Sequence, residues 1–273
     1  MSELLGNLFI GNGELLQPSE FHRFKEKSES QPSVYEVIRV EEGIPLFYED
    51  YMERLKNSFA LLGQEMPLGP KEIYGEVKRL IEATQYRSGP VKLVFGTGNA
   101  SFYMAFLMKA HIPTPEEYIT GVKTVLMREM RPNPNLKMWN KGLRDRSVEL
   151  LNRTNAYEAL LVNTRGLITE ASRSNVFFIK GDEVFTTDEK LILPGITRGK
   201  VLEVCQEHGI VVNFTNLPAD EIGTYDSCFL TGTARKIVPV RAVDDILFHV
   251  ETEMLKRIAD YFEAFVNRYL SKY

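Results

Sequence analysis

The stretch YEALLVNTRGLITEASRSNVFFIKGDEVFTT, residues 157–187, decides how the second half of the chain folds. Four apolar runs within it are separated by segments rich in glycine and polar residues. The segments at Asn163–Gly166 and at Gly181-Asp182 contain the residue types that favour turns between antiparallel strands. We therefore expect two consecutive β-hairpins here.

The segments around these hairpins predict further helices and strands. A helix is expected at 142–156, a second at 195–209 that Gly209 ends, and a third that carries an apolar stripe from Met254 to Tyr269. The runs IVVNFTNL and DSCFLTGT are typical of strands. This half of the chain predicts an α+β domain whose core is a mixed sheet or a β-barrel-like sheet with helices.

The first half predicts a smaller α+β domain. We expect a hairpin at 32–47 that turns at Glu42-Gly43, amphipathic helices at 48–63 and 69–84, and a second hairpin at 89–110. The Pro-rich stretch HIPTPEEY then separates the two halves. The predicted boundaries are 1–112 for the small domain, 113–119 for the linker and 120–273 for the larger domain.

Composition excludes several function classes. The 273 residues are 44% hydrophobic and 26% charged, with a formal net charge of −4, so nucleic-acid or anionic-membrane binding is not indicated. The first residues lack the pattern of a signal peptide, and no apolar run is long enough to span a bilayer. The two cysteines and four scattered histidines predict buried free thiols and no metal site, in a cytoplasmic protein.

Lys137 is the first candidate for chemistry. It lies between Leu136 and the pair Met138-Trp139, so a strand here would be buried on at least one face. An apolar environment lowers the pKa of a lysine, and an amine that forms an imine requires this. The alternative is a solvated surface lysine, which is the more frequent role of any single lysine.

Other candidates come from strand ends and helix starts. Glu170 ends an apolar strand and could face a cationic ring nitrogen, or it could be a solvated carboxylate in a polar turn. The segment LPGITR, residues 193–198, could bind phosphate at a helix start, or Thr197 could simply cap that helix. The Thr-Gly-Thr-Ala turn with Thr233 could bind an anion. Arg54 could be an ordinary surface arginine.

The order and spacing of these segments decide between the alternatives. The blocks LKMWN (136–140), YEALLVNTRGLITEASRSNVFFI (157–179), LPGITR (193–198) and FLTGTARKIVPV (229–240) together resemble the class IV, pyridoxal-phosphate-dependent aminotransferases. The likeness reaches back to VYEVIRV and MERL, and thus covers most of the chain. It implies the two-domain fold type IV architecture and a site between the domains of a homodimer.

The resemblance also implies roles for individual residues. Lys137 matches the catalytic lysine that holds pyridoxal 5′-phosphate as a Schiff base, and Glu170 matches the acid paired with the pyridine nitrogen. Arg54 and Thr233 match phosphate contacts, and Leu193 matches an apolar residue against the cofactor ring. Ile196 and Thr197 match the phosphate-binding helix start. The residues predicted to contact the substrate are Tyr35, Arg39, Arg173 and Ala234.

The sequence departs from the family pattern in places that bear on the substrate. Some members carry a tyrosine five residues after the lysine, where this chain has Gly142, so Tyr35 could take that role or be an ordinary strand aromatic. The arginine–histidine pair of the D-amino-acid branch is absent from VFGTGNASFYM. Arg39 and Arg173 could equally belong to structural ion pairs.

These features favour a transaminase that moves the amino group of a branched-chain L-amino acid to a 2-oxo acid such as 2-oxoglutarate. The alternative enzyme is an aminodeoxychorismate lyase, which eliminates pyruvate with the same cofactor and yields 4-aminobenzoate. A binding module that only keeps the fold is a third possibility, although a scaffold has no need of an imine-forming amine.

Overall fold

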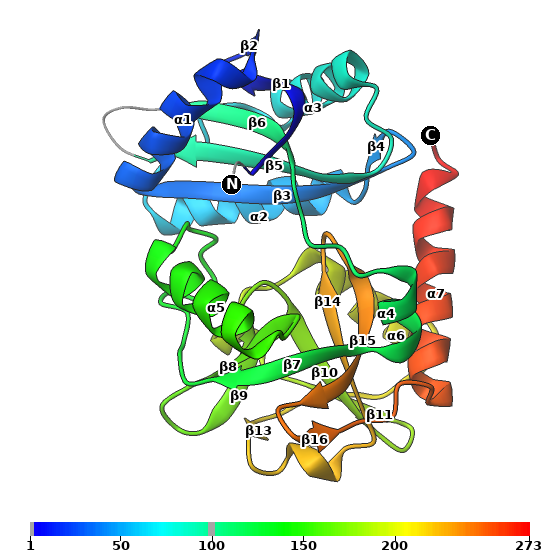
Figure 1. Cartoon of the computed structure of the whole chain (residues 1–273). Coiled ribbons are helices and arrows are strands. Elements are labelled where there is room, and N and C mark those ends of the chain that lie inside the picture. The colour runs from blue at the N-terminus through cyan, green and yellow to red at the C-terminus, as the bar shows by residue number, and fades with distance from the viewer. Residues whose placement is uncertain (1–2, 98–101) are drawn as a thin grey trace. The chain divides into compact units, whose positions relative to one another are not determined.

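The computed structural model describes residues 3–97 and 102–273 and divides the chain into two compact units (Figure 1). Unit 1 comprises Met1–His111, Leu136–Trp139 and Tyr269–Tyr273. Unit 2 comprises Ile112–Asn135 and Asn140–Arg268. The predicted linker, 113–119, contains most of a capped helix, α4 (Pro115–Thr120). Lys137 lies in the short segment that returns to unit 1.

Unit 1 is a six-stranded antiparallel sheet in the order β2-β1-β6-β5-β3-β4, with three helices packed on it. Its strands are β1 (Leu4–Gly11), β2 (Glu14–Leu16), β3 (Ser33–Glu41), β4 (Ile44–Pro45), β5 (Gly89–Gly96) and β6 (Tyr103–Met108). Its helices are α1 (Pro18–Ser30), α2 (Tyr48–Leu61) and α3 (Pro70–Thr84). Both predicted hairpins are present, although the turn at 98–101 lies outside the described residues.

Successive side chains of β3 point to opposite faces of the strand, and the two faces carry different residue types. Val34, Ile38 and Val40 are buried and share a face with Glu36, while Tyr35 and Arg39 lie on the opposite face. Helix α2 packs against β3 through buried apolar side chains, with Leu55 fully buried. Glu36 is therefore a carboxylate on the apolar face of a strand, and such a group requires a charged or hydrogen-bonding partner.

The segment Leu136–Trp139 extends this sheet locally beside β3. The Tyr35 N–H donates to the Lys137 carbonyl and the Trp139 N–H donates to the Ser33 carbonyl, each at 3.1 Å. Val34 and Met138 form an isolated antiparallel bridge between them. Lys137 thus occupies a short strand-like segment, as its apolar neighbours predict, and its orientation is fixed by backbone pairing.

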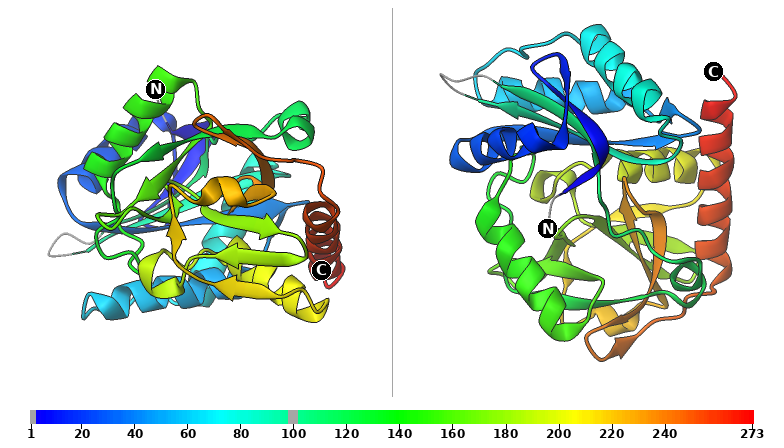
Figure 2. Two further views of the ribbon diagram at one scale, coloured as in Figure 1. Left: turned by 90° about the horizontal axis from the view of Figure 1, so that it is seen from below. Right: turned by 45° about the horizontal axis from the view of Figure 1, so that its top comes forward.

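Unit 2 is a mixed ten-stranded sheet whose main path is β12-β11-β10-β14-β15-β7-β8-β9-β13, with β16 paired to β15. Parallel pairs join β7 to β8 and to β15, and β11 to β12, while the others are antiparallel. The sheet curls strongly, as both views in Figure 2 show, and β9 comes to lie against β10. The mixed, barrel-like sheet predicted for the second half is confirmed.

Both hairpins of the stretch 157–187 are present in unit 2, as β8/β9 and β10/β11. The strands are β7 (Val122–Met127), β8 (Glu158–Val162), β9 (Leu167–Ala171), β10 (Asn175–Lys180), β11 (Glu183–Thr186), β12 (Val212–Phe214), β13 (Leu217–Pro218), β14 (Ser227–Gly232), β15 (Lys236–Val243) and β16 (Ile246–Leu247). The longer helices are α5 (Lys141–Thr154), α6 (Ile196–Glu207) and α7 (Glu253–Leu270), and two 3₁₀ turns are η1 (Glu189–Leu191) and η2 (Ile222–Thr224).

Helix α1 was not among the helices that the sequence predicts. Its sequence, PSEFHRFKEKSES, is strongly polar, and it buries only Phe21 and Phe24. These two rings make edge-to-face contacts with Phe9, at centroid distances of 5.3 and 5.5 Å. The helix is therefore held by tertiary aromatic packing, which a weak periodicity does not reveal.

Among the residues that the structure describes, no helix combines the length and the apolar character needed to cross a bilayer. Over the same ranges, no group of three histidine, cysteine, aspartate or glutamate side chains could hold a metal ion.

The two cysteines are free and buried, as the sequence predicts. Burial raises the pKa of the Cys205 thiol to about 11, and it also raises the pKa of Cys228. Because the thiolate is the reactive form, we expect neither thiol of the native protein to react with Ellman's reagent at neutral pH. Both should react after denaturation in guanidinium, and rapid labelling of the folded protein would contradict this burial.

Candidate active site

Lys137 and Tyr35 lie together at the edge of unit 1. The Lys137 Nζ lies 5.0 Å from the centroid of the Tyr35 ring, within the range of a cation–π contact. The Trp139 ring packs edge-on to Tyr35 at 6.1 Å between centroids. Lys92 of β5, only 5% exposed, lies 4.3 Å from the Trp139 ring and forms an ion pair with Glu3. The amine of Lys137 thus lies beside the Tyr35 ring, and the amine of Lys92 lies over the Trp139 ring.

Glu170 is a buried carboxylate held by an arginine. It lies at the end of β9, is 2% exposed, and accepts a hydrogen bond from Arg131 Nε at 2.9 Å. The Leu193 N–H donates weakly to its other oxygen, at 3.4 Å. This geometry excludes the alternative of a solvated carboxylate in a polar turn. The paired arginine fixes the position of the carboxylate.

The start of α6 offers backbone donors. Its N-cap is Gly195, which provides no side-chain hydrogen bond, so Thr197 lies in the first turn and does not cap the helix. A Cβ on Gly195 would lie 2.1 Å from the Asn175 Oδ1, which explains the glycine. Asn175 Nδ2 also donates to the Leu193 carbonyl at 3.0 Å. The N–H groups of such a first turn form a favourable site for a phosphate.

Arg54 lies on α2, buried rather than on the surface. It is 7% exposed and pairs in a bidentate manner with Glu36, Nε to Oε1 at 2.8 Å and Nη2 to Oε2 at 2.6 Å. Burial alone would lower the pKa of Arg54, but the Glu36 carboxylate more than offsets this and raises it. Glu36 therefore fixes the guanidinium by the edge that carries Nε and Nη2.

The Thr-Gly-Thr-Ala turn connects β14 to β15 beside the segment that follows Glu170. Asn175 at the start of β10 is paired with Thr231 at the end of β14, so the two connections lie at the same end of adjacent strands. Thr233 and Ala234 are both half-buried. Sequence motifs that are about sixty residues apart are thereby brought together within unit 2.

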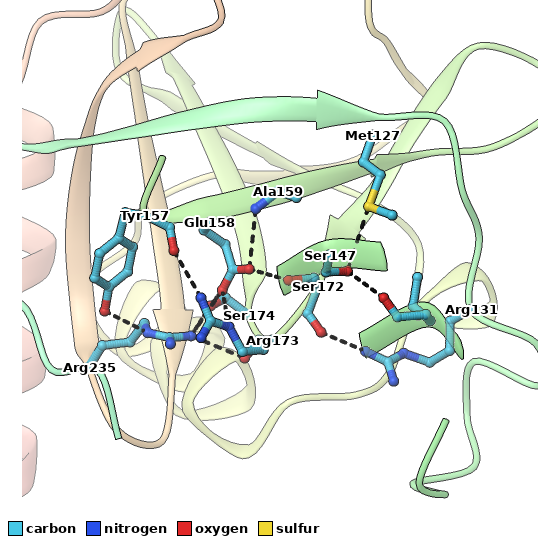
Figure 3. Close-up of polar contacts among 11 residues, drawn as sticks. Met127, Arg131, Ser147, Tyr157, Glu158, Ala159, Ser172, Arg173, Ser174 and Arg235 are labelled. Atoms are coloured by element: carbon cyan, nitrogen blue, oxygen red, sulfur yellow. Dashed lines mark hydrogen bonds and ion pairs between the residues drawn. The ribbon is translucent and has the colours of Figure 1, made fainter. Parts of the chain in front are cut away.

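A buried charge cluster joins these two connections (Figure 3). We define the Glu158 cluster as Glu158 with Arg173, Arg235, Ser172, Ser174 and Tyr157. The Glu158 Oε2 lies 3.4 Å from Arg173 Nε and 3.1 Å from Arg235 Nη1. Its Oε1 accepts hydrogen bonds from the Ser172 hydroxyl and from the Ala159 N–H. Burial alone would raise the pKa of Glu158, but Arg173 and Arg235 lower it below its ordinary value.

The sequence leaves two roles open for Arg39 and Arg173, a substrate contact or a structural ion pair, and both residues form ion pairs. Arg39 pairs with Glu41 at 2.8 Å, and Arg173 belongs to the Glu158 cluster. Their substrate contacts stay predictions.

Three partners were missed by the sequence reasoning: Glu36, Arg131 and Glu158. A signal existed for Glu36, which interrupts the apolar positions of β3, and for Glu158, which begins a strand of otherwise apolar residues.

The likeness to known proteins fits this geometry. A family model described as amino-transferase class IV matches residues 33–243. The chain belongs to the class IV aminotransferases. It is 30% identical over 253 residues to the D-alanine aminotransferase of Bacillus licheniformis, covering 85% of this chain and 87% of the relative. It is 25% identical to a probable branched-chain-amino-acid aminotransferase of Rickettsia bellii, covering 85% and 86%.

A solved relative shares the class IV aminotransferase fold. The T.th. branched-chain amino acid aminotransferase with pyridoxamine 5′-phosphate superposes with a TM-score of 0.83 at 22% identity, covering 97% of this chain and 96% of that chain. The family and fold expected from the sequence are confirmed, and so is the expectation of a pyridoxal-phosphate-dependent transaminase.

We expect the Glu36–Arg54 pair to be essential for stability. Glu36→Gln leaves a buried guanidinium without its counter-charge, so the free energy of unfolding should fall by about 3–5 kcal/mol in urea titrations followed by circular dichroism. Glu53→Gln, which changes an exposed residue next to Arg54, is the control and should change it by less than about 0.5 kcal/mol. Equal stability of the two variants would contradict the role of the pair.

Glu158 should make stability depend on pH at the acid end. Its folded pKa lies below the ordinary 4.5, so its contribution is present above the unfolded pKa and is lost as pH falls through the folded pKa. The stability difference between wild type and Glu158→Gln should therefore be largest near neutral pH and shrink below about pH 4. Thermal unfolding across pH tests this, with exposed Glu149→Gln as control. A difference that does not change with pH would contradict an ionised Glu158.

Proposed function

We propose that this aminotransferase moves the amino group of a branched-chain L-amino acid to a 2-oxo acid such as 2-oxoglutarate, with Lys137 as the catalytic residue. The observation that carries the assignment is the position of Lys137: two backbone hydrogen bonds hold its segment beside β3, and its amine lies 5.0 Å from the centroid of the Tyr35 ring. A lysine held by backbone pairing has an orientation that a flexible surface lysine lacks. An imine-forming amine requires that orientation.

The side chains present fit pyridoxal 5′-phosphate. The cofactor needs an amine, an anionic partner for a protonated ring nitrogen and several donors for a phosphate. Lys137 supplies the amine, and Glu170, held by Arg131, supplies the carboxylate. The phosphate donors are the first turn of α6 at Ile196 and Thr197, the hydroxyl of Thr233, and the guanidinium of Arg54. Leu193 is the apolar residue assigned to the ring.

When bound, the cofactor supplies an aldehyde carbon for the amino group and a ring that accepts the electron pair left when the α-proton is removed. Lys137 Nζ would remove that proton from the substrate α-carbon as a general base. It would then donate the proton as a general acid in the second half of the transfer. Glu170 holds the proton on the ring nitrogen, since a buried carboxylate beside an arginine is a fixed negative charge. Arg54 and the α6 amides bind charge without taking part in bond breaking.

An apolar substrate side chain is supported by the surroundings of the amine. The Tyr35 ring lies beside the Lys137 amine and packs against the Trp139 ring in unit 1, and an aromatic surface suits a branched aliphatic group. The lack of the arginine–histidine pair after β5 points the same way, whereas the relatives include both a branched-chain and a D-alanine aminotransferase. Ala234, through its backbone, and Arg39 are the further residues assigned to the substrate. The homodimer and the cytoplasmic location stay predictions.

The deciding experiment is the visible absorption spectrum of the purified protein with pyridoxal phosphate, before and after L-leucine, L-glutamate or D-alanine. We expect a band that L-leucine and L-glutamate shift and D-alanine does not. Lys137→Ala should lose this wild-type band and at least about a thousandfold in transfer rate, because it removes both the covalent attachment and the general base. Exposed Lys180→Ala is the matched control.

Four other outcomes of these experiments would each contradict one part of the proposed function. A shift with D-alanine alone would replace the proposed substrate class, and pyruvate release from aminodeoxychorismate would replace transfer by elimination. Full turnover by Lys137→Ala would overturn the catalytic assignment. Wild-type protein that binds no cofactor would overturn the function itself.

A further inference from the structure

The Glu158 cluster connects the two loops of unit 2 that the proposed function relies on. Ser172, Arg173 and Ser174 lie in the β9–β10 connection that begins just after Glu170, and Arg235 follows Thr233-Ala234 directly in the β14–β15 turn. The Arg235 Nη1 donates to the Ser174 hydroxyl at 2.6 Å and to the Arg173 carbonyl at 3.3 Å. One carboxylate, Glu158, thus binds groups from both loops (Figure 3).

Arg235 is a buried arginine that is bonded through Nε and Nη1. It is 5% exposed, its Nε donates to the Tyr157 hydroxyl at 2.9 Å, and its Nη1 pairs with Glu158. Its carbonyl accepts a hydrogen bond from the Tyr118 hydroxyl at 2.9 Å. Arg235 is therefore the structural partner of Glu158, and its bonds fix the turn that carries Thr233 and Ala234.

Arg173 differs from Arg235 in exposure. Its side chain is 35% exposed. Its Nε faces Glu158 and its Nη2 donates to the Tyr157 carbonyl at 2.9 Å, while Nη1 makes no hydrogen bond to any residue that the structure describes. The guanidinium is therefore held through Nε and Nη2 on a partly exposed side chain, which leaves the Nη1 amino group for a further acceptor.

The charge of the cluster is not balanced. Two arginines share one glutamate, which leaves a formal charge of +1 on a pair of which Arg235 is buried and Arg173 is 35% exposed. A structural pair would need only one arginine, and the second, Arg173, has the more exposed side chain, which an anion from solvent can approach. A guanidinium fixed by a carboxylate, with one edge exposed, is well suited to bind a second carboxylate.

We propose that Glu158 is a positioning residue that aims Arg173 Nη1 at a carboxylate of the substrate. The inference rests on the proposed function, because it places this carboxylate beside the loop of Glu170 and the turn of Thr233-Ala234. The carboxylate is either the α-carboxylate that every substrate carries or the distal one of an acidic substrate such as 2-oxoglutarate. The chemistry of recognition is the same for both.

The test measures binding of unreactive carboxylates to the cofactor-loaded enzyme by titration of its visible spectrum. Glutarate represents a dicarboxylate and 4-methylpentanoate a monocarboxylate. In Arg173→Met we expect dissociation constants to rise about tenfold to a hundredfold, because a charge-assisted hydrogen bond is lost. A rise for glutarate alone assigns the distal carboxylate, and a rise for both assigns the α-carboxylate. Unchanged constants for both would overturn the proposal.

A double-mutant cycle separates positioning from mere structural support. Glu158→Gln should weaken carboxylate binding in the wild-type background and have no further effect on it in Arg173→Met. Equal losses in both backgrounds would mean that Glu158 does not act through Arg173. If Glu158→Gln alone fails to fold, Glu158→Asp replaces it in the cycle, since it keeps the charge and shifts the carboxylate by one methylene.

Exposed Arg165→Met, in the turn of the β8/β9 hairpin, is the matched control and should bind both probes as wild type does. KM values for 2-oxoglutarate and for 4-methyl-2-oxopentanoate should follow the same pattern, with kcat changed by less than about threefold, because binding and not bond breaking is affected. Failure of the proposed function is distinguishable, since wild-type enzyme would then bind no cofactor and transfer no amino group.

Discussion

The pairing of residues 136–139 with β3 is the constraint on which the proposed chemistry depends. Two backbone hydrogen bonds, through Tyr35 and Trp139, hold a four-residue segment whose sequence neighbours on both sides belong to unit 2. Pro132 and Pro134 precede the segment, and Asn140 follows it and caps α5 through a 3.0 Å bond to the Leu143 N–H. The lysine is thus placed by backbone geometry on both sides, which fixes the point from which its side chain extends.

A second recurrent feature is a carboxylate on a strand that is paired with arginine from elsewhere in the chain. Glu36 on β3 binds Arg54 of α2, Glu170 on β9 binds Arg131, and Glu158 on β8 binds two arginines from loops. Strands provide rigid positions, and a buried carboxylate remains ionised only beside a cation. Each pair therefore fixes one charged group at a defined place. Glu170, Arg54 and Arg173 are the groups for which that placement has a proposed chemical purpose.

Much of the fold was predictable because local patterns and tertiary packing agree. The hairpins at 157–187 have turn residues at the required places, and helices α2, α3 and α7 carry clear apolar stripes. Helix α1 was missed because two phenylalanines and the ring of Phe9 hold it, rather than its own periodicity. The sequence leaves open whether Glu170 is a solvated carboxylate and whether Arg54 is a surface arginine. The structure shows that both are buried.

The sequence alone determined the family, the two-part α+β organisation and the residue types for a pyridoxal phosphate enzyme, because these depend on short blocks in a fixed order. Tertiary structure alone decided which charges are paired. Arg131 meets Glu170 across 39 positions and Arg235 meets Glu158 across 77, and no local pattern specifies such a pair. The physical reason is that a buried charge selects its partner by proximity in the fold, and proximity is set by strand register and loop path rather than by spacing along the chain.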